Sequence, residues 1–172
     1  MTYRTNARIA GVAYFVYFAA GIGSLVLSGR AHATDVLSVM TSFSALVLGV
    51  TLYAITREED PDIAMLGLAC RVIEGIPGEG TIYFAVGSTL FAWLLLRGRM
   101  IPIALAWLGV IAGVLLVVIL LLQRAGLFGG AVNWSSPVTW LTSLPMLVFE
   151  VALALWLLIK GVATPAPTAS RL

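Results

Sequence analysis

Charged residues are scarce in this chain of 172 residues: they make up 10% of the sequence, against 60% for hydrophobic residues. Soluble domains usually carry about 25% charged residues, so the composition excludes an ordinary soluble domain. The chain has one cysteine, Cys70, which excludes an intrachain disulfide and any site that needs several cysteines. Its single histidine, His32, excludes bis-histidine haem ligation and leaves a histidine-based zinc site without ligands.

The motifs of common enzyme chemistries are also absent. No G-x-S-x-G elbow, phosphate loop or G-x-G-x-x-G turn occurs. The net charge is +2, but no basic cluster with interleaved aromatic residues appears, so we expect no nucleic-acid binding. The acidic run at 58–62 is typical of a solvated loop rather than a metal site. We therefore expect no metal and no cofactor, and the lack of a nucleophile–base pair disfavours an enzyme.

What the chain does have is a series of long apolar runs and a mean hydropathy of +1.03. The runs lie at 9–27, 36–55, 63–76, 81–96, 101–122 and 138–159. A membrane-spanning helix needs about 20 residues, so the third run is short and the fourth slightly short. The sequence predicts an all-α bundle of six transmembrane spans. It forms a single integral-membrane domain at 1–163, followed by a flexible cytoplasmic tail at 164–172.

The basic residues orient this topology. If six spans begin from a cytoplasmic N-terminus, seven basic residues fall on the cytoplasmic side and two on the other. The cytoplasmic set is Arg4, Arg8, Arg57, Arg97, Arg99, Lys160 and Arg171, and the outer set is Arg30 and Arg124. Merging the third and fourth runs into one span would reverse this bias. The positive-inside rule therefore favours six spans in the cytoplasmic membrane, with both termini in the cytoplasm.

The first run has a second interpretation as a signal peptide. Ala31-His32-Ala33 has the small-x-small form of a signal-peptidase site and follows a basic segment and an apolar run. That run spans about 19 residues, whereas the apolar region of a signal peptide usually spans about 7–15. We favour an uncleaved first helix, and cleavage after Ala33 would leave five helices.

Three ionisable residues, Arg71, Glu74 and Glu150, lie inside the apolar runs. Arg71 and Glu74 are three residues apart and share one helix face. They lie about 12 and 16 Å from the inner end of their run, and Glu150 lies about 15 Å from the same side, at 1.5 Å per residue. Because a charge in hydrocarbon needs a partner or a water-filled cavity, we expect these residues to form one buried cluster.

This cluster would hold two carboxylates against one guanidinium. In a low-dielectric site the excess negative charge should be relieved by a proton on Glu74 or Glu150, or by a bound cation or cationic ligand. We therefore take Arg71, Glu74 and Glu150 as candidate ligand- or proton-binding residues. The alternative is structural, because a buried ion pair can serve only to fix how helices pack.

Small and hydroxylated residues form stripes on three of the predicted helices. The stripes are Tyr14, Tyr17, Gly21 and Ser24; Ser38, Thr41, Ser42 and Ala45; and Thr139, Thr142, Ser143 and Met146. Such residues usually pack membrane helices together, and this use is favoured over cavity lining. Tyr14, Tyr17, Thr142 and Met146 are the candidates for a cavity wall. Gly109 and Gly113 form a further close-packing motif, compatible with internal packing or with a homo-oligomer.

Four short segments carry a family resemblance. They are Ala7-Arg8-Ile9-Ala10-Gly11; Arg71-x-x-Glu74; Arg99-Met-Ile-Pro102 with Leu108-Gly109; and Glu150 followed by Trp156-Leu-Leu-Ile-Lys160-Gly161. In these segments the chain resembles the uncharacterised bacterial multi-pass membrane proteins known as domain of unknown function 4386. The resemblance implies a helical membrane protein without an assigned activity. The chain departs from the family pattern in a compressed region between its third and fourth runs.

Together these features predict a membrane protein with a small-molecule or proton-linked binding role, related to transport and centred on the buried Arg/Glu cluster. The competing interpretation is a non-catalytic structural or accessory subunit, in which the cluster only fixes helix packing. A membrane enzyme using Glu74 or Glu150 as an acid–base group is a third alternative. The expected partners are the lipid bilayer, a small-molecule ligand and a second copy of the chain.

Overall fold

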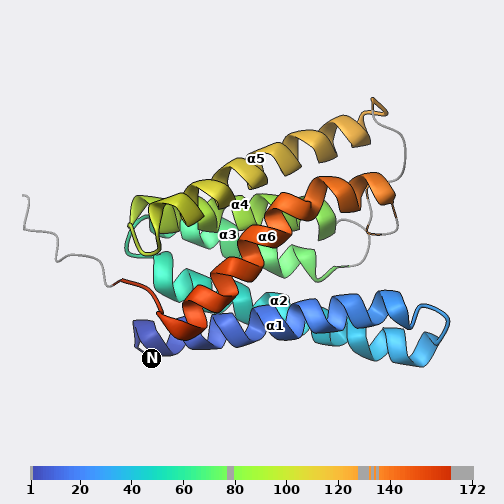
Figure 1. Ribbon diagram of the computed structural model, residues 1–172, viewed down its shortest axis with the longest axis horizontal. Helices are drawn as coiled ribbons and strands as arrows, with labels where there is room; N and C mark the ends of the chain where they lie inside the picture. Colours follow the sequence, from blue (N-terminus) through green and yellow to red (C-terminus); the bar gives the residue numbers. More distant parts are fainter. Residues whose placement is uncertain (1, 77–79, 128–131, 133, 135, 164–172) are drawn as a thin grey trace, which may run out of the picture.

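Six helices and no strand are found in the computed structural model, which describes residues 2–76, 80–127, 132, 134 and 136–163 (Figure 1). The helices are α1 (Tyr3–Val26), α2 (Ala31–Thr56), α3 (Pro61–Glu74), α4 (Gly80–Arg97), α5 (Ile103–Arg124) and α6 (Pro137–Ile159). Each helix coincides with one predicted apolar run, so the all-α bundle is confirmed. The predicted tail at 164–172 lies outside the described residues.

Five of the six helices are long and apolar enough to cross a membrane. The exception is α3, whose 14 residues extend about 21 Å, less than the hydrocarbon thickness of about 30 Å. The third apolar run was expected to be short, and the helix that it forms is short as well. The chain is a multi-pass integral membrane protein in which α3 reaches only part of the way through the bundle.

The helices form a closed ring in chain order. Each helix packs against the next one along the chain, and α6 closes the ring by packing against α1. In Figure 1, α6 runs diagonally between α1 and α5, while α3 and α4 lie behind it. Among the described residues, α3 and α6 have no direct backbone packing, so only long side chains join them across the middle of the ring.

Local sequence explains where α3 begins and how closely its neighbours approach. The Asp60 side chain accepts a hydrogen bond from the Ile63 N–H at 3.2 Å, and Pro61 occupies the first turn, where its missing N–H costs nothing. At Arg71, α3 is flanked by Gly49 of α2 and Gly87 of α4, where an added Cβ would lie 2.9 to 3.0 Å from side-chain atoms of α3. These glycines allow α3 to lie deep between α2 and α4.

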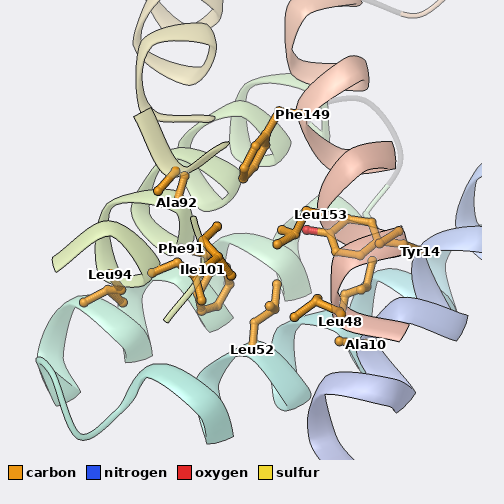
Figure 2. Packing of buried hydrophobic residues seen from close by; sticks show 14 of the residues in the cluster. Ala10, Tyr14, Leu48, Leu52, Phe91, Ala92, Leu94, Ile101, Phe149 and Leu153 are labelled. Carbon is orange, nitrogen blue, oxygen red and sulfur yellow. The ribbon is translucent and has the colours of Figure 1, made fainter. Parts of the chain in front are cut away.

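Large apolar side chains fill the half of the bundle in which α1 begins. Leu48 and Leu52 of α2, Phe91 of α4 and Leu153 of α6 are at most 2% exposed and form one cluster. Figure 2 shows them converging from different helices, with the Tyr14 ring pointing from α1 into the core beside Leu153. This end of the bundle is closed by packing.

Both glycines of the α5 motif pack inside the chain. Gly109 lies against the Phe149 ring of α6, and Gly113 lies against Thr89 of α4 and Met146 of α6. The internal-packing use of this motif is therefore observed, while a homo-oligomer stays a prediction.

Replacing Gly109 with alanine is expected to lower the free energy of unfolding by about 1–3 kcal/mol, because the new Cβ would overlap the buried Phe149 ring. Gly21→Ala is the matched control, since Gly21 is also helical and no atom lies within 4 Å of its added Cβ. The control should be stabilised by up to about 1 kcal/mol. Thermal unfolding of both purified variants measures the difference, and an equal change in the two would contradict this packing.

Candidate ligand site

Arg71 is the centre of a buried polar cluster in the middle of the ring. Its side chain has no exposed surface, and its two terminal nitrogens make three hydrogen bonds. Nη1 donates to Glu74 Oε2 at 2.9 Å, while Nη2 donates to Ser88 Oγ at 2.7 Å and to Glu150 Oε1 at 3.0 Å. The guanidinium thus joins the packed pair α3 and α4 to α6, which has no direct backbone packing with either helix among the described residues.

Glu150 has two very different oxygens. Its Oε1 accepts hydrogen bonds from Arg71 Nη2 and from Ser88 Oγ, the latter at 2.8 Å. Its Oε2 is fully buried and has no hydrogen-bond partner among the described residues. A buried carboxylate oxygen without a donor is costly, so it marks a position where a further group is favoured. Arg71 Nε is also buried without a partner among the described residues.

Glu74 completes the cluster on the side of α1. Its Oε2 pairs with Arg71, and its Oε1 accepts a hydrogen bond from the Tyr17 hydroxyl at 2.6 Å. The Arg71 guanidinium carbon also lies 5.3 Å from the centre of the Phe84 ring, within the range of a cation–π contact. Two carboxylates therefore surround one guanidinium, and the cluster carries one formal negative charge in excess.

A cavity of about 640 Å³ adjoins this cluster. Glu74 and Glu150 line its inner part, and it extends along α1 to Ser28, near the α1–α2 turn. Arg71 is not among the lining residues, and of the two carboxylates Glu74, with 6% of its side chain exposed against 1% for Glu150, offers more surface to the cavity. The stripe residues that line it are Tyr17, Gly21, Ser24, Ser38, Thr41, Ser42, Ala45 and Ser143.

The short α3–α4 hairpin explains where this cavity lies. α3 and α4 extend about 21 and 27 Å, whereas α1 and α2 extend about 36 and 39 Å at 1.5 Å per residue. In Figure 1, α1 and α2 accordingly reach farther than α3 and α4 toward the α1–α2 turn. The C-terminal end of α3, at Glu74, Gly75 and Ile76, lines the cavity floor.

The predicted site residues occupy two different environments. Arg71, Glu74 and Glu150 are in mutual contact, as their similar depths led us to expect. Of the four predicted cavity-wall residues, Tyr17 lines the cavity. Tyr14 and Met146 are instead buried in helix packing, and the Thr142 hydroxyl bonds to the carbonyl of Val138 in its own helix.

Several residues of the site, among them Ser88, Phe84 and Trp134, were not selected from the sequence. Ser88 lies nine residues before Arg97, close to the depth of Glu150, so the same depth comparison could have found it. Phe84 and Trp134 line the cavity, but their positions depend on helix rotation and on a loop. No pattern in the sequence encodes those two contacts.

Comparisons with known proteins bear on the family and leave the activity open. Neither the curated proteins nor the solved structures include a match to this chain. The first two resemblance segments, at 7–11 and 71–74, lie before the region that a family model matches. That model, described as domain of unknown function (DUF4386), matches residues 78–161 and so confirms the family resemblance in this part of the chain.

Proposed function

We propose that this membrane protein binds a small cationic molecule in its cavity, in a role related to transport, with Glu74 and Glu150 as the groups that the ligand meets. The observation that carries the proposal is the buried Glu150 Oε2, which has no donor among the described residues and belongs to a cavity-lining side chain. A bound cation would satisfy this oxygen and balance the excess negative charge.

Two further features favour a positive ligand. The cavity floor includes the C-terminal end of α3, where the helix dipole places a partial negative charge of about half an elementary charge. The only guanidinium of the cluster, that of Arg71, has no exposed surface. An anion entering the cavity would therefore meet the Glu74 carboxylate and a negative helix end, with the second carboxylate, Glu150, just behind them.

The cavity leads to one end of the bundle, while the other end is packed. Leu48, Leu52, Phe91 and Leu153 fill the half of the bundle in which α1 begins. A binding site that opens on one side and is closed on the other is the arrangement that alternating access requires of one state. If the protein lies in the cytoplasmic membrane with both termini in the cytoplasm, the cavity opens to the outside of the cell.

Charged thiol reagents test this proposal without knowledge of the ligand. Ser42 lines the cavity and its hydroxyl donates to the Gly75 carbonyl at 3.3 Å, so Ser42→Cys places a thiol at the cavity floor. In a Cys70→Ala background, a trimethylammonium-bearing methanethiosulfonate should react at least about tenfold faster than its sulfonate counterpart. A unit charge about 6 Å away, at an effective dielectric constant of about 40, contributes about 1.4 kcal/mol, a factor of ten in rate.

Val118→Cys in the same background is the control, because Val118 is 47% exposed on α5 and does not line this cavity. It should react slowly with both reagents when the protein is in a bilayer. Adding Glu150→Gln to Ser42→Cys should remove most of the preference for the cationic reagent. Slow, charge-independent reaction of the thiol in the Ser42→Cys variant would overturn the proposal.

The competing function, a structural or accessory subunit, has one observation in its favour. The Arg71 terminal nitrogens, Ser88 and Glu150 Oε1 form a compact network that joins three helices. Buried networks of this kind can specify helix packing without binding anything. Under this alternative, the Ser42→Cys thiol would show no preference between the two reagents.

A further inference from the structure

The wall of the cavity carries a row of aromatic rings that begins at the carboxylates. Tyr17, Phe84, Trp134 and Trp140 all line the cavity. Neighbouring ring centres are 6.5 Å apart for Tyr17 and Phe84, 5.5 Å for Phe84 and Trp134, and 5.6 Å for Trp134 and Trp140. The row therefore runs without a break from α1 across α4 to α6.

Each end of the row is held in place. At the inner end, the Tyr17 hydroxyl donates to Glu74 Oε1 at 2.6 Å. At the outer end, the Trp140 indole N–H donates to the Trp134 carbonyl oxygen at 2.5 Å. These bonds hold the Tyr17 and Trp140 rings, at the two ends of the row, in their orientations.

We infer that the ligand of this cavity is an organic ammonium ion, quaternary or protonated, whose positive nitrogen lies near Glu74 and Glu150 and whose apolar groups contact the aromatic row. Aromatic faces together with carboxylates are the combination that recognises quaternary ammonium groups. One ring of the row already contacts a cation, since the Arg71 guanidinium lies 5.3 Å from the Phe84 ring centre. The inference rests on the proposed function and specifies its substrate class.

An inorganic ion fits the site less well. Among the described residues no group of three His, Cys, Asp or Glu side chains is placed to hold a metal ion. The cavity volume of about 640 Å³ falls in the range of small-molecule pockets, about 300–1,000 Å³. A bare ion would make no contact with most of the apolar and aromatic wall of this cavity. An ammonium ion that bears alkyl or aryl groups would contact both the carboxylates and that wall.

Benzyltrimethylammonium binding tests the inference. In lipid nanodiscs, calorimetric titration should show saturable binding at one site per chain, and benzenesulfonate should not bind. Trp134→Leu should weaken binding by about tenfold through loss of one aromatic face, and Trp134→Phe should retain most of the affinity. Trp107→Leu is the control, because Trp107 lies on α5, is 47% exposed and does not line the cavity.

The outcomes separate the inference from the function on which it rests. If benzyltrimethylammonium does not bind, but radioactive sodium binds in a manner that Glu150→Gln abolishes, then the ligand is an inorganic cation and the inference is wrong while the function stands. The inference also fails if Trp134→Leu and Trp107→Leu bind benzyltrimethylammonium equally well. If neither cation binds and the Ser42→Cys thiol shows no charge preference, both the inference and the function fail.

Discussion

Arg71→Leu is expected to lower the free energy of unfolding by about 3–5 kcal/mol, the largest stability effect of any single substitution considered for this protein. The substitution removes the only positive group that contacts Glu74 and Glu150 among the described residues. Two buried carboxylates would then share one site without a counter-charge, and Ser88 would lose one of its two partners. Thermal and denaturant unfolding of the purified protein measure the loss.

Arg97→Leu is the matched control for this prediction. Arg97 also pairs with a carboxylate, Asp60, at 3.1 Å, but its side chain is 50% exposed. An exposed pair contributes at most about 1 kcal/mol, so the control should change stability little. Equal stability of the two variants would show that the Arg71 cluster contributes nothing beyond a surface ion pair.

The second large effect is expected from neutralising the whole cluster. Arg71→Leu combined with Glu74→Leu and Glu150→Leu leaves no buried charge uncompensated, and well-packed apolar replacements of buried ion pairs are often neutral or stabilising. We expect the triple variant to unfold within about 2 kcal/mol of the wild type and to be more stable than Arg71→Leu alone. In the Ser42→Cys background, however, it should lose the preference for the cationic thiol reagent entirely.

The free energy of unfolding and the thiol reactivity of the triple variant together distinguish a binding site from a cluster that only holds the helices together. Recovery of stability with loss of charge preference is the result expected for a binding site. If the triple variant is as unstable as Arg71→Leu, the three polar groups are required for helix packing, and the structural alternative is correct. If it is stable and keeps the charge preference, the negative charge of the cavity arises from groups other than Glu74 and Glu150.

Much of the fold follows from hydropathy alone. Each predicted run matches one helix, and the shortest run, at 63–76, became the shortest helix, Pro61–Glu74. Signals that act within one chain segment account for this agreement: apolar length, the Asp60 cap and the Pro61 first turn. They do not depend on how the helices are arranged.

The polar cluster was predictable for a different reason. A charge inside hydrocarbon must find a partner, and few positions at similar depth can supply one. Depth counted from the helix ends therefore brought Arg71 and Glu150 together, although they are 79 residues apart in the chain. Counting the depth of the serine residues in the same way would also have placed Ser88 in the cluster.

The position of the cavity depends on how the helices pack against one another, which no short segment of the sequence encodes. Its lining comes from α1, α2, the C-terminal end of α3, α4, α6 and the segment before α6, and the rotation of each helix decides which face points inward. The hydroxyl stripes are equally suited to packing and to lining: Ser42 and Ser143 line the cavity and Thr142 does not, although the Ser143 and Thr142 hydroxyls both donate to carbonyls of α6.

The most direct measurement is a crystal structure in a lipid phase, at a resolution that shows ordered water, with attention to Glu150 Oε2. We expect α3 to end at Glu74, and a water molecule or cation to contact Oε2 from a cavity that continues to Ser28. Apolar side chains packed over Glu150, leaving a dry network around Arg71, would contradict the binding site. The charges would then be part of the architecture alone.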